Sequence, residues 1–402
     1  MENKATRFIG LDIHKAYFVT VGVNAQREVV FGPRKVSVYQ LETWVEQHLR
    51  LEDAVVLEVT TNAYLFHDVI RPHVGSVTVV HPPHVSLVTR VAVKTDQKAA
   101  LALAQLHAVG LLTGIWIPPQ KVRDLRALIA QRGKMVRLST IAKNRLHAVM
   151  QRKHLRLPEK PFADEQRSWW QSLPLTEIEL MRVCSDLDTL AFARQQLAQI
   201  EDYLKRESAQ DERIPLLVQL PGVGWLTAMT ILAAIGDVTR FENAKKLVGY
   251  AGLGSRVHDS GTTHTTGRIT KAGRRDLRRA MVNAANHAVE YHTHWKKELT
   301  RLEPRMGRSK AVVAVARKLL VTVWHVLTKE QADRFAEPQG VGRSLLAHAY
   351  KVGVKNLPSG QSAPGFVREQ LDRLNIGQDI KIVPWGSEHR NLPPSQLLLE
   401  KG

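Results

Sequence analysis

Short apolar runs near the start of the chain predict β-strands. Residues 7–13 and 17–23 form two such runs with almost no helical signal, which predicts a hairpin, and Val29 and Val30 extend the pattern towards a third strand. Further short runs at 54–57 and 77–80 are typical of buried strands. Together these runs predict a sheet in the first part of the chain.

Helical spacing of apolar residues begins after the first strands. It recurs over residues 41–49 and 64–70, and residues 98–109 are rich in the strong helix formers Ala and Leu. Strands therefore come first, and helices then alternate with strands. This order favours an RNase-H-like α/β domain, although the pattern alone fits other mixed α/β folds equally.

A long basic helix is predicted from residue 122 to residue 157. Its ten Lys and Arg residues accompany a single acid, Asp124. So few compensating acids favour a contact with a polyanion over a solvated surface helix. The residues that we expect to contact nucleic acid here are Arg123, Arg126, Arg137, Lys143 and Arg145.

A second long helical pattern follows the break at Pro158 and Pro161. Residues 176–207 carry Leu and Ile at helical spacing, with mixed charges between them. Two long helices joined by a proline-containing break predict an antiparallel pair or an oligomerising coiled coil. We expect this second helix to form part of a contact between protomers.

Glycines mark a turn in the next region. Residues 220–224, Leu-Pro-Gly-Val-Gly, precede a helical run at 226–235 and resemble a helix-hairpin-helix turn, in which backbone amides approach a phosphate. A glycine-containing connection without a ligand fits the pattern equally well. Gly222 and Gly224 are therefore candidate nucleic-acid contacts.

A second basic segment follows a stretch rich in Gly, Ser and Thr at 252–267. Residues 271–279 predict a helix whose arginines stack in like-charged pairs four residues apart, an arrangement that a phosphate backbone would stabilise. The candidate contacts in this region are Arg268, Lys271, Arg274, Arg275, Arg278 and Arg279.

These patterns divide the chain into four segments. We expect an α/β domain at 1–118, a basic helical coiled-coil arm at 119–210, a mostly helical domain at 211–334 and a C-terminal extension at 335–402. The extension is rich in Gly, Pro, Gln and Ser with little periodicity. It predicts extended segments that order on a partner.

Charge narrows the class of protein. The 402 residues include 57 Lys and Arg against 38 Asp and Glu, a formal net charge of +19 at pH 7, which favours a nucleic-acid binder. No apolar stretch is expected to span a membrane, and we expect a cytoplasmic protein that associates with the nucleoid when bound to DNA. The single cysteine, Cys184, argues against a disulfide framework or a thiolate zinc site.

Three acids lie near the ends of predicted elements. Asp12 follows the apolar run of the first strand, Glu58 ends a later strand, and Asp96 precedes a helix. Each alone is typical of a surface charge or a helix cap. If the three converge, their mutual repulsion favours a divalent cation, which can activate an attacking oxygen and stabilise a leaving one.

The sequence around these acids resembles a known family. The matching words are Ile-Gly-Leu-Asp-Ile-His-Lys at 9–15, Leu-Glu-Val-Thr at 57–60, Lys-Thr-Asp-Gln-Lys-Ala-Ala at 94–100, Leu-Pro-Gly-Val-Gly at 220–224, Tyr-Ala-Gly-Leu at 250–253, Ser-Gly at 260–261 and the basic word at 269–279. In this order, over about residues 7–329, they resemble the insertion-sequence 110 transposases, which are bridge-RNA-guided serine recombinases.

The resemblance implies a RuvC-like RNase-H-fold domain whose Asp, Glu, Asp, Asp tetrad holds Mg²⁺ or another divalent cation. Asp12, Glu58 and Asp96 match its first three acids, and Ser260 matches the nucleophile that forms a phosphoserine bond with DNA. The resemblance also implies a structured bridge RNA that pairs with donor and target DNA. It implies a homodimer or homotetramer in which the acids of one protomer meet the serine of another.

One position departs from the family pattern. The family word runs Lys-Thr-Asp-x-x-Asp-Ala, and Ala99 stands where the fourth acid would lie, one helical turn after Asp96. Either the chain is inactive or it manages with three acids and water. His258 and His264 are expected to face solvent or phosphate, and a solvent role is also favoured for His14.

Two other functions fit the same residues. A metal-dependent RuvC-like nuclease or resolvase would use water as its nucleophile, with Ser260 as a turn residue. A catalytically inactive nucleic-acid-binding protein would account for Ala99 directly. The ordered words favour an RNA-guided recombinase that cuts and rejoins donor and target DNA.

Overall fold

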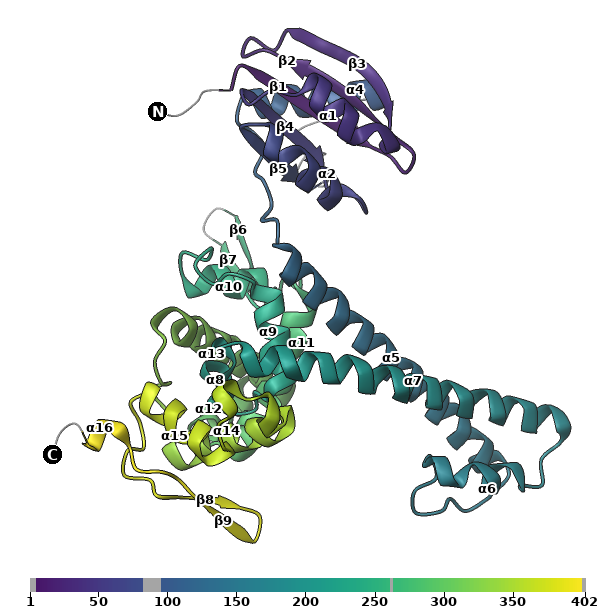
Figure 1. Ribbon diagram of the computed structural model, residues 1–402, viewed down its shortest axis with the longest axis vertical. Helices are drawn as coiled ribbons and strands as arrows, with labels where there is room; N and C mark the ends of the chain where they lie inside the picture. Colours follow the sequence, from purple (N-terminus) through teal and green to yellow (C-terminus); the bar gives the residue numbers. More distant parts are fainter. Residues whose placement is uncertain (1–4, 82–94, 261–262, 400–402) are drawn as a thin grey trace. The chain divides into compact units, whose positions relative to one another are not determined.

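The computed structural model describes residues 5–81, 95–260 and 263–399, with only the backbone described at 257–260, 263–266, 359 and 399. The chain forms two compact units, Met1–Pro119 and Gln120–Gly402 (Figure 1). The boundary between them lies one residue from the predicted boundary at 118. The other three predicted segments all belong to the second unit.

A five-stranded sheet of order β3-β2-β1-β4-β5 forms the centre of the first unit. Its strands are β1 (Arg7–Ile13), β2 (Tyr17–Val23), β3 (Val29–Ser37), β4 (Asp53–Glu58) and β5 (Ser76–Val80). The first three strands pair antiparallel, whereas β4 runs parallel to both β1 and β5. The predicted strands are confirmed, and so is the mixed α/β class.

Helices cover both faces of this sheet (Figure 1). The helices α1 (Leu41–His48) and α2 (Ala63–Ile70) pack on one face, and α4 (Asp96–Ala108) packs on the other. Successive side chains of a strand point to opposite faces, so Leu11 faces α1 and α2 while Asp12 lies on the face that α4 covers. The three predicted helices are confirmed.

The helix α4 packs directly against the backbone of β1 at Gly10. A Cβ atom at this position would lie 2.0 Å from the carbonyl oxygen of Ala100 and 2.8 Å from the amide nitrogen of Ala104. Any side chain larger than hydrogen would push the helix away. Gly10 therefore fixes how closely the start of α4 approaches the end of β1.

Two long helices form the arm of the second unit. These are α5 (Gln120–Arg152) and α7 (Glu177–Gln210), with the short helix α6 (Arg167–Gln171) between them. Arg132 pairs with Glu201 at 2.6 Å, and Lys153 pairs with Glu179 at 2.9 Å. The later residue of the first helix thus pairs with the earlier residue of the second, which means that the two helices run antiparallel. The predicted antiparallel pair is confirmed.

The six helices that follow the arm share one hydrophobic core. They are α8 (Arg213–Val218), α9 (Trp225–Ile235), α10 (Ala244–Tyr250), α11 (Arg275–Tyr291), α12 (Thr293–Met306) and α13 (Arg308–Lys329). By length and composition alone α13 could cross a membrane, which the sequence patterns did not anticipate. Its apolar residues, among them Val315, Leu319 and Val323, are buried in this core, as in the central helix of a globular domain.

The C-terminal extension is folded, so the expectation of extended segments is wrong. It contains α14 (Pro338–Val352), α15 (Ala363–Arg373), a hairpin of β8 (Ile382–Trp385) and β9 (Glu388–Asn391), and α16 (Gln396–Leu399). Residues of α14 and α15 are buried in the same core as α8–α13. Each of these two helices has one proline, at its first or second position, where proline is compatible with the start of a helix.

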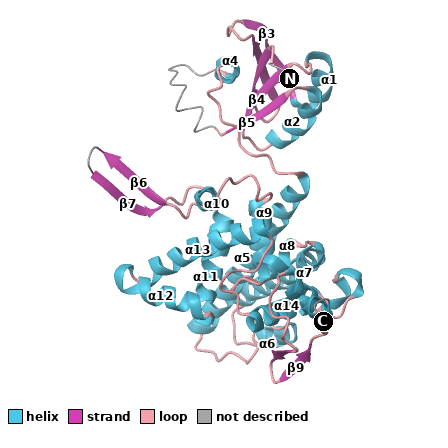
Figure 2. Ribbon diagram, turned by 90° about the vertical axis from the view of Figure 1, so that its left-hand side faces the viewer, coloured by secondary structure: helices cyan, strands magenta, loops and turns pink. Residues whose placement is uncertain are grey.

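A second hairpin lies within the stretch rich in Gly, Ser and Thr. Its strands are β6 (Ser255–Ser260) and β7 (Thr263–Ile269), and it extends away from the helices of its unit (Figure 2). The sequence patterns predicted no strands here, because few apolar residues alternate along the stretch.

Candidate active site

Asp12 and Asp96 meet where β1 ends and α4 begins. His14 lies between them, with its Nε2 atom 3.4 Å from an Oδ2 atom of each aspartate. One donor atom from each of the three side chains lies within 4.8 Å of the others. The structure thus brings two predicted acids together and adds a histidine for which a solvent role was favoured.

The start of α4 fixes Asp96. Thr95 is the N-cap residue, and its hydroxyl accepts a hydrogen bond from the amide of Lys98 at 3.3 Å. Asp96 is therefore the first residue of the helix, where the helix dipole favours a negative charge. Ala99 follows one turn later and is exposed.

Tyr17 holds the other side of the cluster. Its hydroxyl donates to Oδ2 of Asp96 at 2.9 Å, and its ring packs on the ring of His14 with 4.7 Å between centroids. The hydrogen bond to Asp96 raises the pKa of Tyr17, so the phenol keeps its proton and remains a donor. Sequence reasoning missed Tyr17, although the predicted hairpin brings the start of β2 to the end of β1.

Electrostatics make the cluster receptive to a cation. Burial raises the pKa of Asp12; the neighbouring His14 lowers it, and the charge of Asp96 raises it. The Nε2 atom of His14 is buried and has no hydrogen-bond partner. Two carboxylates and an imidazole nitrogen in this setting fit a divalent cation.

Glu58 lies at the same edge of the sheet. Leu57 of β4 pairs with Leu11 of β1 in parallel register, so Glu58 follows beside Asp12. Among the residues that the structure describes, Glu58 is not in the group whose donor atoms converge. Three predicted acids thus share one edge, and two of them are in direct proximity to His14.

Ser260 ends β6, opposite Thr263. The segments 250–253 and 269–279, both part of the family resemblance, meet at the base of this hairpin. The amide of Lys271 donates to the carbonyl oxygen of Gly252 at 3.1 Å, and the amide of Arg274 donates to the carbonyl oxygen of Tyr250 at 2.8 Å. These bonds anchor the strand that carries Ser260. Gly261, like Lys94 of an earlier word, lies outside the described residues.

Two family models match the chain over these regions. Residues 9–155 match the DEDD-type transposase model of the IS110 family, and residues 214–301 match the model described as transposase IS116/IS110/IS902 family. The two matches together span more than half of the chain.

The chain belongs to the IS110 family of transposases.

Curated relatives agree with this membership. The chain is 24% identical over 347 residues to the transposase for insertion sequence element IS1111A of Coxiella burnetii, covering 82% of this chain and 92% of the relative. It is 25% identical over 339 residues to the pilin gene-inverting protein of Moraxella bovis, covering 81% and 96%. The first unit is thus a DEDD-family, RuvC-like domain, and the second family model includes Ser260.

The predicted basic helix at 271–279 starts later than expected. Helix α11 begins at Arg275, because Lys271 and Gly273 have φ angles of 55° and 116°. Arg274 bonds to Asp276, with its Nε atom 3.0 Å from Oδ1, and Arg278 donates to the carbonyl of Ala251 at 2.8 Å. The predicted stack of Arg274 on Arg278 is therefore wrong.

Four of the candidate contacts in this region are exposed. They are Arg268, Lys271, Arg275 and Arg279. Arg268 lies on β7 of the hairpin that carries Ser260, Lys271 follows that strand, and Arg275 and Arg279 lie at the start of α11.

The basic helix α5 has more compensating acids than its own sequence provides. The antiparallel partner α7 supplies them: besides the pairs at Arg132 and Lys153, Arg145 lies 3.4 Å from Asp186. The expectation of an uncompensated basic block is therefore wrong, because the acids come from a distant part of the sequence.

The predicted contacts on α5 fall into two groups. Arg126 donates to the carbonyl oxygens of Ala233 and Ala234 at 2.7 and 2.8 Å and so caps the end of α9. Arg123 also has a partner within the structure. Arg137 and Lys143 are exposed.

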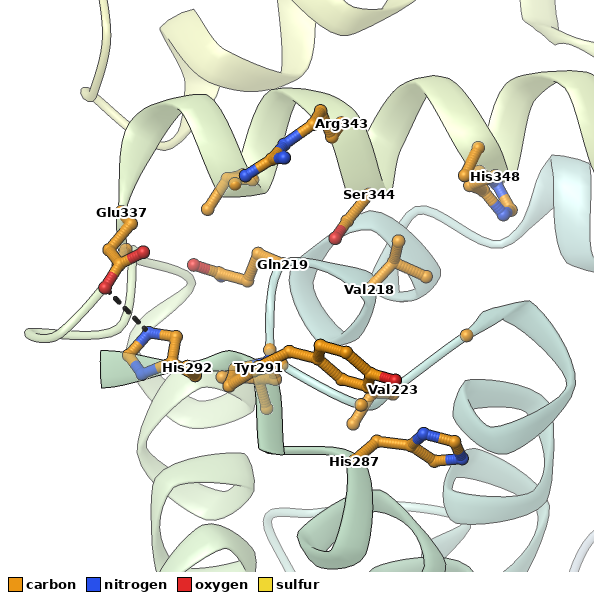
Figure 3. Close-up of a pocket in the computed structure, with 18 of the residues that line it drawn as sticks. Val218, Gln219, Val223, His287, Tyr291, His292, Glu337, Arg343, Ser344 and His348 are labelled. Atoms are coloured by element: carbon orange, nitrogen blue, oxygen red, sulfur yellow. Dashed lines mark ion pairs between the residues drawn. The ribbon is translucent and has the colours of Figure 1, made fainter. Parts of the chain in front are cut away.

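The turn at Gly222 and Gly224 lines a cavity of about 550 Å³. Figure 3 shows His287 and Tyr291 of α11 below this cavity and Ser344 and His348 of α14 above it. His348 is buried, and this burial lowers its pKa to about 4. The cavity beside the uncapped start of α9 is therefore lined by this neutral histidine together with charged side chains, among them Glu337, Arg343 and Lys351.

The two glycines of this turn have different roles. Gly222 has a φ angle of +78°, and a Cβ atom there would lie 2.2 Å from the carbonyl oxygen of Ala284, whereas a Cβ atom at Gly224 would meet nothing within 4 Å. Gly222 is thus required by packing. Gly224 is the N-cap residue of α9, and no packing contact requires a glycine there.

The substitution Gly222→Ala should lower the free energy of unfolding of the second unit by roughly 3 kcal/mol, from backbone strain and overpacking. Gly224→Ala, two residues away, should leave the melting temperature nearly unchanged. Thermal unfolding of both variants checks this. Equal melting temperatures would show that the turn is not held by the contact with Ala284.

Proposed function

We propose that this chain is a recombinase that cuts and rejoins donor and target DNA through a phosphoserine bond at Ser260. In this proposal a divalent cation, Mg²⁺ or another, is held at Asp12, Glu58 and Asp96. The observation that carries the proposal is the convergence of Asp12 and Asp96 within a domain that matches the DEDD-type transposase model. The order of the five strands supports a RuvC-like RNase H fold for that domain.

The chemistry follows from a small set of side chains. The hydroxyl of Ser260 attacks a DNA phosphorus; a phosphoserine bond forms as the bond to the leaving DNA oxygen breaks, and that oxygen takes up a proton. A terminal DNA hydroxyl then attacks the phosphoserine and releases the serine, so one phosphodiester is exchanged for another without an external energy source. A bound divalent cation supplies Lewis acidity to the phosphate oxygens.

Relatives support rejoining as well as cutting. A protein from Moraxella bovis that aligns with 81% of this chain is named for inverting a pilin gene. Inversion of a gene requires that cut strands be joined in a new order. We infer the same pair of steps for this chain.

Nucleic acids are the partners in this proposal. The net charge of +19 and the exposed arginines beside the hairpin support binding to phosphate backbones. We propose that a structured guide RNA pairs with donor and target DNA, so that base pairing selects the sequence while the protein binds the backbone. The protein would then act in the cytoplasm, in association with the nucleoid.

Assembly is the remaining part of the proposal. Exposed apolar residues lie on α7 at Ile178, Met181 and Phe192, with exposed fractions of 70%, 66% and 52%. Such residues are suited to a contact between protomers. We propose a homodimer or homotetramer in which the acids of one protomer act with the serine of another.

A matched pair of serine variants tests the nucleophile. Ser260→Ala should reduce DNA adducts that survive detergent by at least about 10²-fold, because no oxygen is left to attack phosphorus. Ser255→Ala, at the other end of β6, should form them as the unmodified chain does. The substrate is a plasmid with the DNA that flanks the gene for this chain. Cutting by Ser260→Ala at the unmodified rate would identify water as the nucleophile.

The RNA is tested separately in the same preparation. A discrete structured RNA should copurify with the protein, and ribonuclease treatment should abolish target cutting. If no discrete RNA is found, guidance by RNA is refuted while the role of Ser260 is not.

A further inference from the structure

We propose that His14 is a metal ligand that takes the place of the fourth carboxylate, and that it moves the preference of the site from Mg²⁺ towards Mn²⁺. The inference rests on the proposed function only in that both use one cation site at Asp12 and Asp96.

The helix α4 cannot supply the missing donor. Ala99 has no ligand atom, and no Asp or Glu occurs from residue 97 to residue 114. The inner face of α4, at Ala100, Leu103 and Ala104, is apolar and buried against the sheet. Any fourth charged or imidazole ligand from the protein must therefore come from another element.

His14 lies where such a ligand is needed. Its Nε2 atom is equidistant, at 3.4 Å, from one oxygen of Asp12 and one of Asp96. Neighbouring ligand atoms of one octahedral cation lie roughly 3 Å apart when each is about 2.1 Å from the cation. The Nε2 atom is buried, and its only polar contacts among the described residues are these two long ones to carboxylate oxygens, a spacing that a shared cation would also produce.

Tyr17 holds the imidazole in this orientation. The backbone amide of His14 donates to the carbonyl of Tyr17 at 2.9 Å, and the Tyr17 ring stacks on the imidazole at an interplanar angle of 32°. The same tyrosine donates its hydroxyl hydrogen to Asp96. One residue of β2 thus orients two ligands, a common arrangement around metal sites.

The change of donor alters which cation is favoured. Mg²⁺ prefers oxygen ligands, whereas an imidazole nitrogen suits transition metals. Replacing a carboxylate by an imidazole also removes one negative charge from the site. The loss of charge weakens the binding of both cations, and the nitrogen donor weakens Mg²⁺ binding relative to Mn²⁺ binding.

Mn²⁺ bound to the full chain provides a direct test. Pulsed electron paramagnetic resonance should detect coupling between the Mn²⁺ electron spin and a ¹⁴N nucleus, and this coupling should disappear in His14→Gln. His73→Gln, which alters a half-buried histidine outside the cluster, should retain it. By calorimetry, His14→Gln should weaken Mn²⁺ binding by about 10- to 100-fold. The double variant His14→Gln, Ala99→Asp should regain binding and favour Mg²⁺.

The outcomes separate this inference from the proposed function. Mn²⁺ that binds in an Asp12-dependent way without ¹⁴N coupling, or with coupling that survives in His14→Gln, overturns the role of His14 and leaves the cation site intact. If the unmodified chain binds neither Mn²⁺ nor Mg²⁺, both the proposed cation site and the role of His14 are refuted.

Discussion

Replacing Asp12 with Asn should lower the rate of DNA strand cleavage by at least about 10³-fold, which corresponds to roughly 4 kcal/mol of transition-state stabilisation. Asp12 is the acid that lies beside both Asp96 and His14, so its loss removes a charged ligand from the centre of the cluster. Single-turnover cleavage of the flanking-DNA plasmid measures the effect.

The same substitution should stabilise the metal-free chain, although it slows cleavage. Without a cation, burial and the charge of Asp96 raise the pKa of Asp12, so its ionised form costs the fold stability. Asp12→Asn should therefore raise the melting temperature of the metal-free chain at neutral pH. That gain should shrink as the pH falls through the raised pKa of Asp12, because the native carboxyl then becomes neutral as well.

An exposed acid of the same unit is the control for both measurements. Glu46→Gln, on the outer side of α1, should change neither cleavage nor melting temperature by a measurable amount. Cleavage by Asp12→Asn at the rate of the Glu46→Gln control would remove the acidic cluster from the reaction.

Gly10→Ala should be the most damaging single-methyl change in the first unit. The added Cβ atom would lie 2.0 Å from the carbonyl oxygen of Ala100, so α4 must move away from β1. The cost should be about 3 kcal/mol or more of the free energy of unfolding. Because Asp96 begins α4, the same displacement should separate it from Asp12 and weaken Mn²⁺ binding.

Gly133→Ala is the matched control, since a Cβ atom at that position meets nothing within 4 Å. It lies inside the helix α5, where alanine is favoured over glycine by about 0.5–1 kcal/mol. Thermal unfolding and calorimetry with Mn²⁺ measure both variants. Normal Mn²⁺ binding by Gly10→Ala would show that the contact between α4 and β1 does not set the geometry of the cluster.

Much of the fold follows from local patterns. The strands of the first unit are short apolar runs, and the long helices of the arm repeat apolar residues at helical spacing, so both are visible without tertiary information. The hairpin that carries Ser260 could not be predicted in this way, because its strands are polar and its pairing depends on the contacts at its base. The C-terminal helices were missed because proline and glycine read as breaks, although both prolines stand at helix starts.

The site was predictable only in part. Asp12 and Asp96 stood out through the sequence words around them, and the structure brings them together. The positions of His14 and Tyr17 depend on the register between β1 and β2, which apolar patterns do not specify to within one residue. The acids that compensate α5 come from α7; an antiparallel pair was among the predictions, but the sequence did not specify the register that brings Glu201 to Arg132 and Asp186 to Arg145.

The central claim is that Ser260 becomes covalently joined to DNA under the control of the acidic cluster. Its most direct test is to form the protein–DNA adduct with the full chain and its RNA, digest both polymers, and locate the modified peptide by mass spectrometry. The account predicts a nucleotide remnant on Ser260, absent when Asp12 is replaced by Asn. A remnant on another residue, or cut DNA with no adduct, would contradict it.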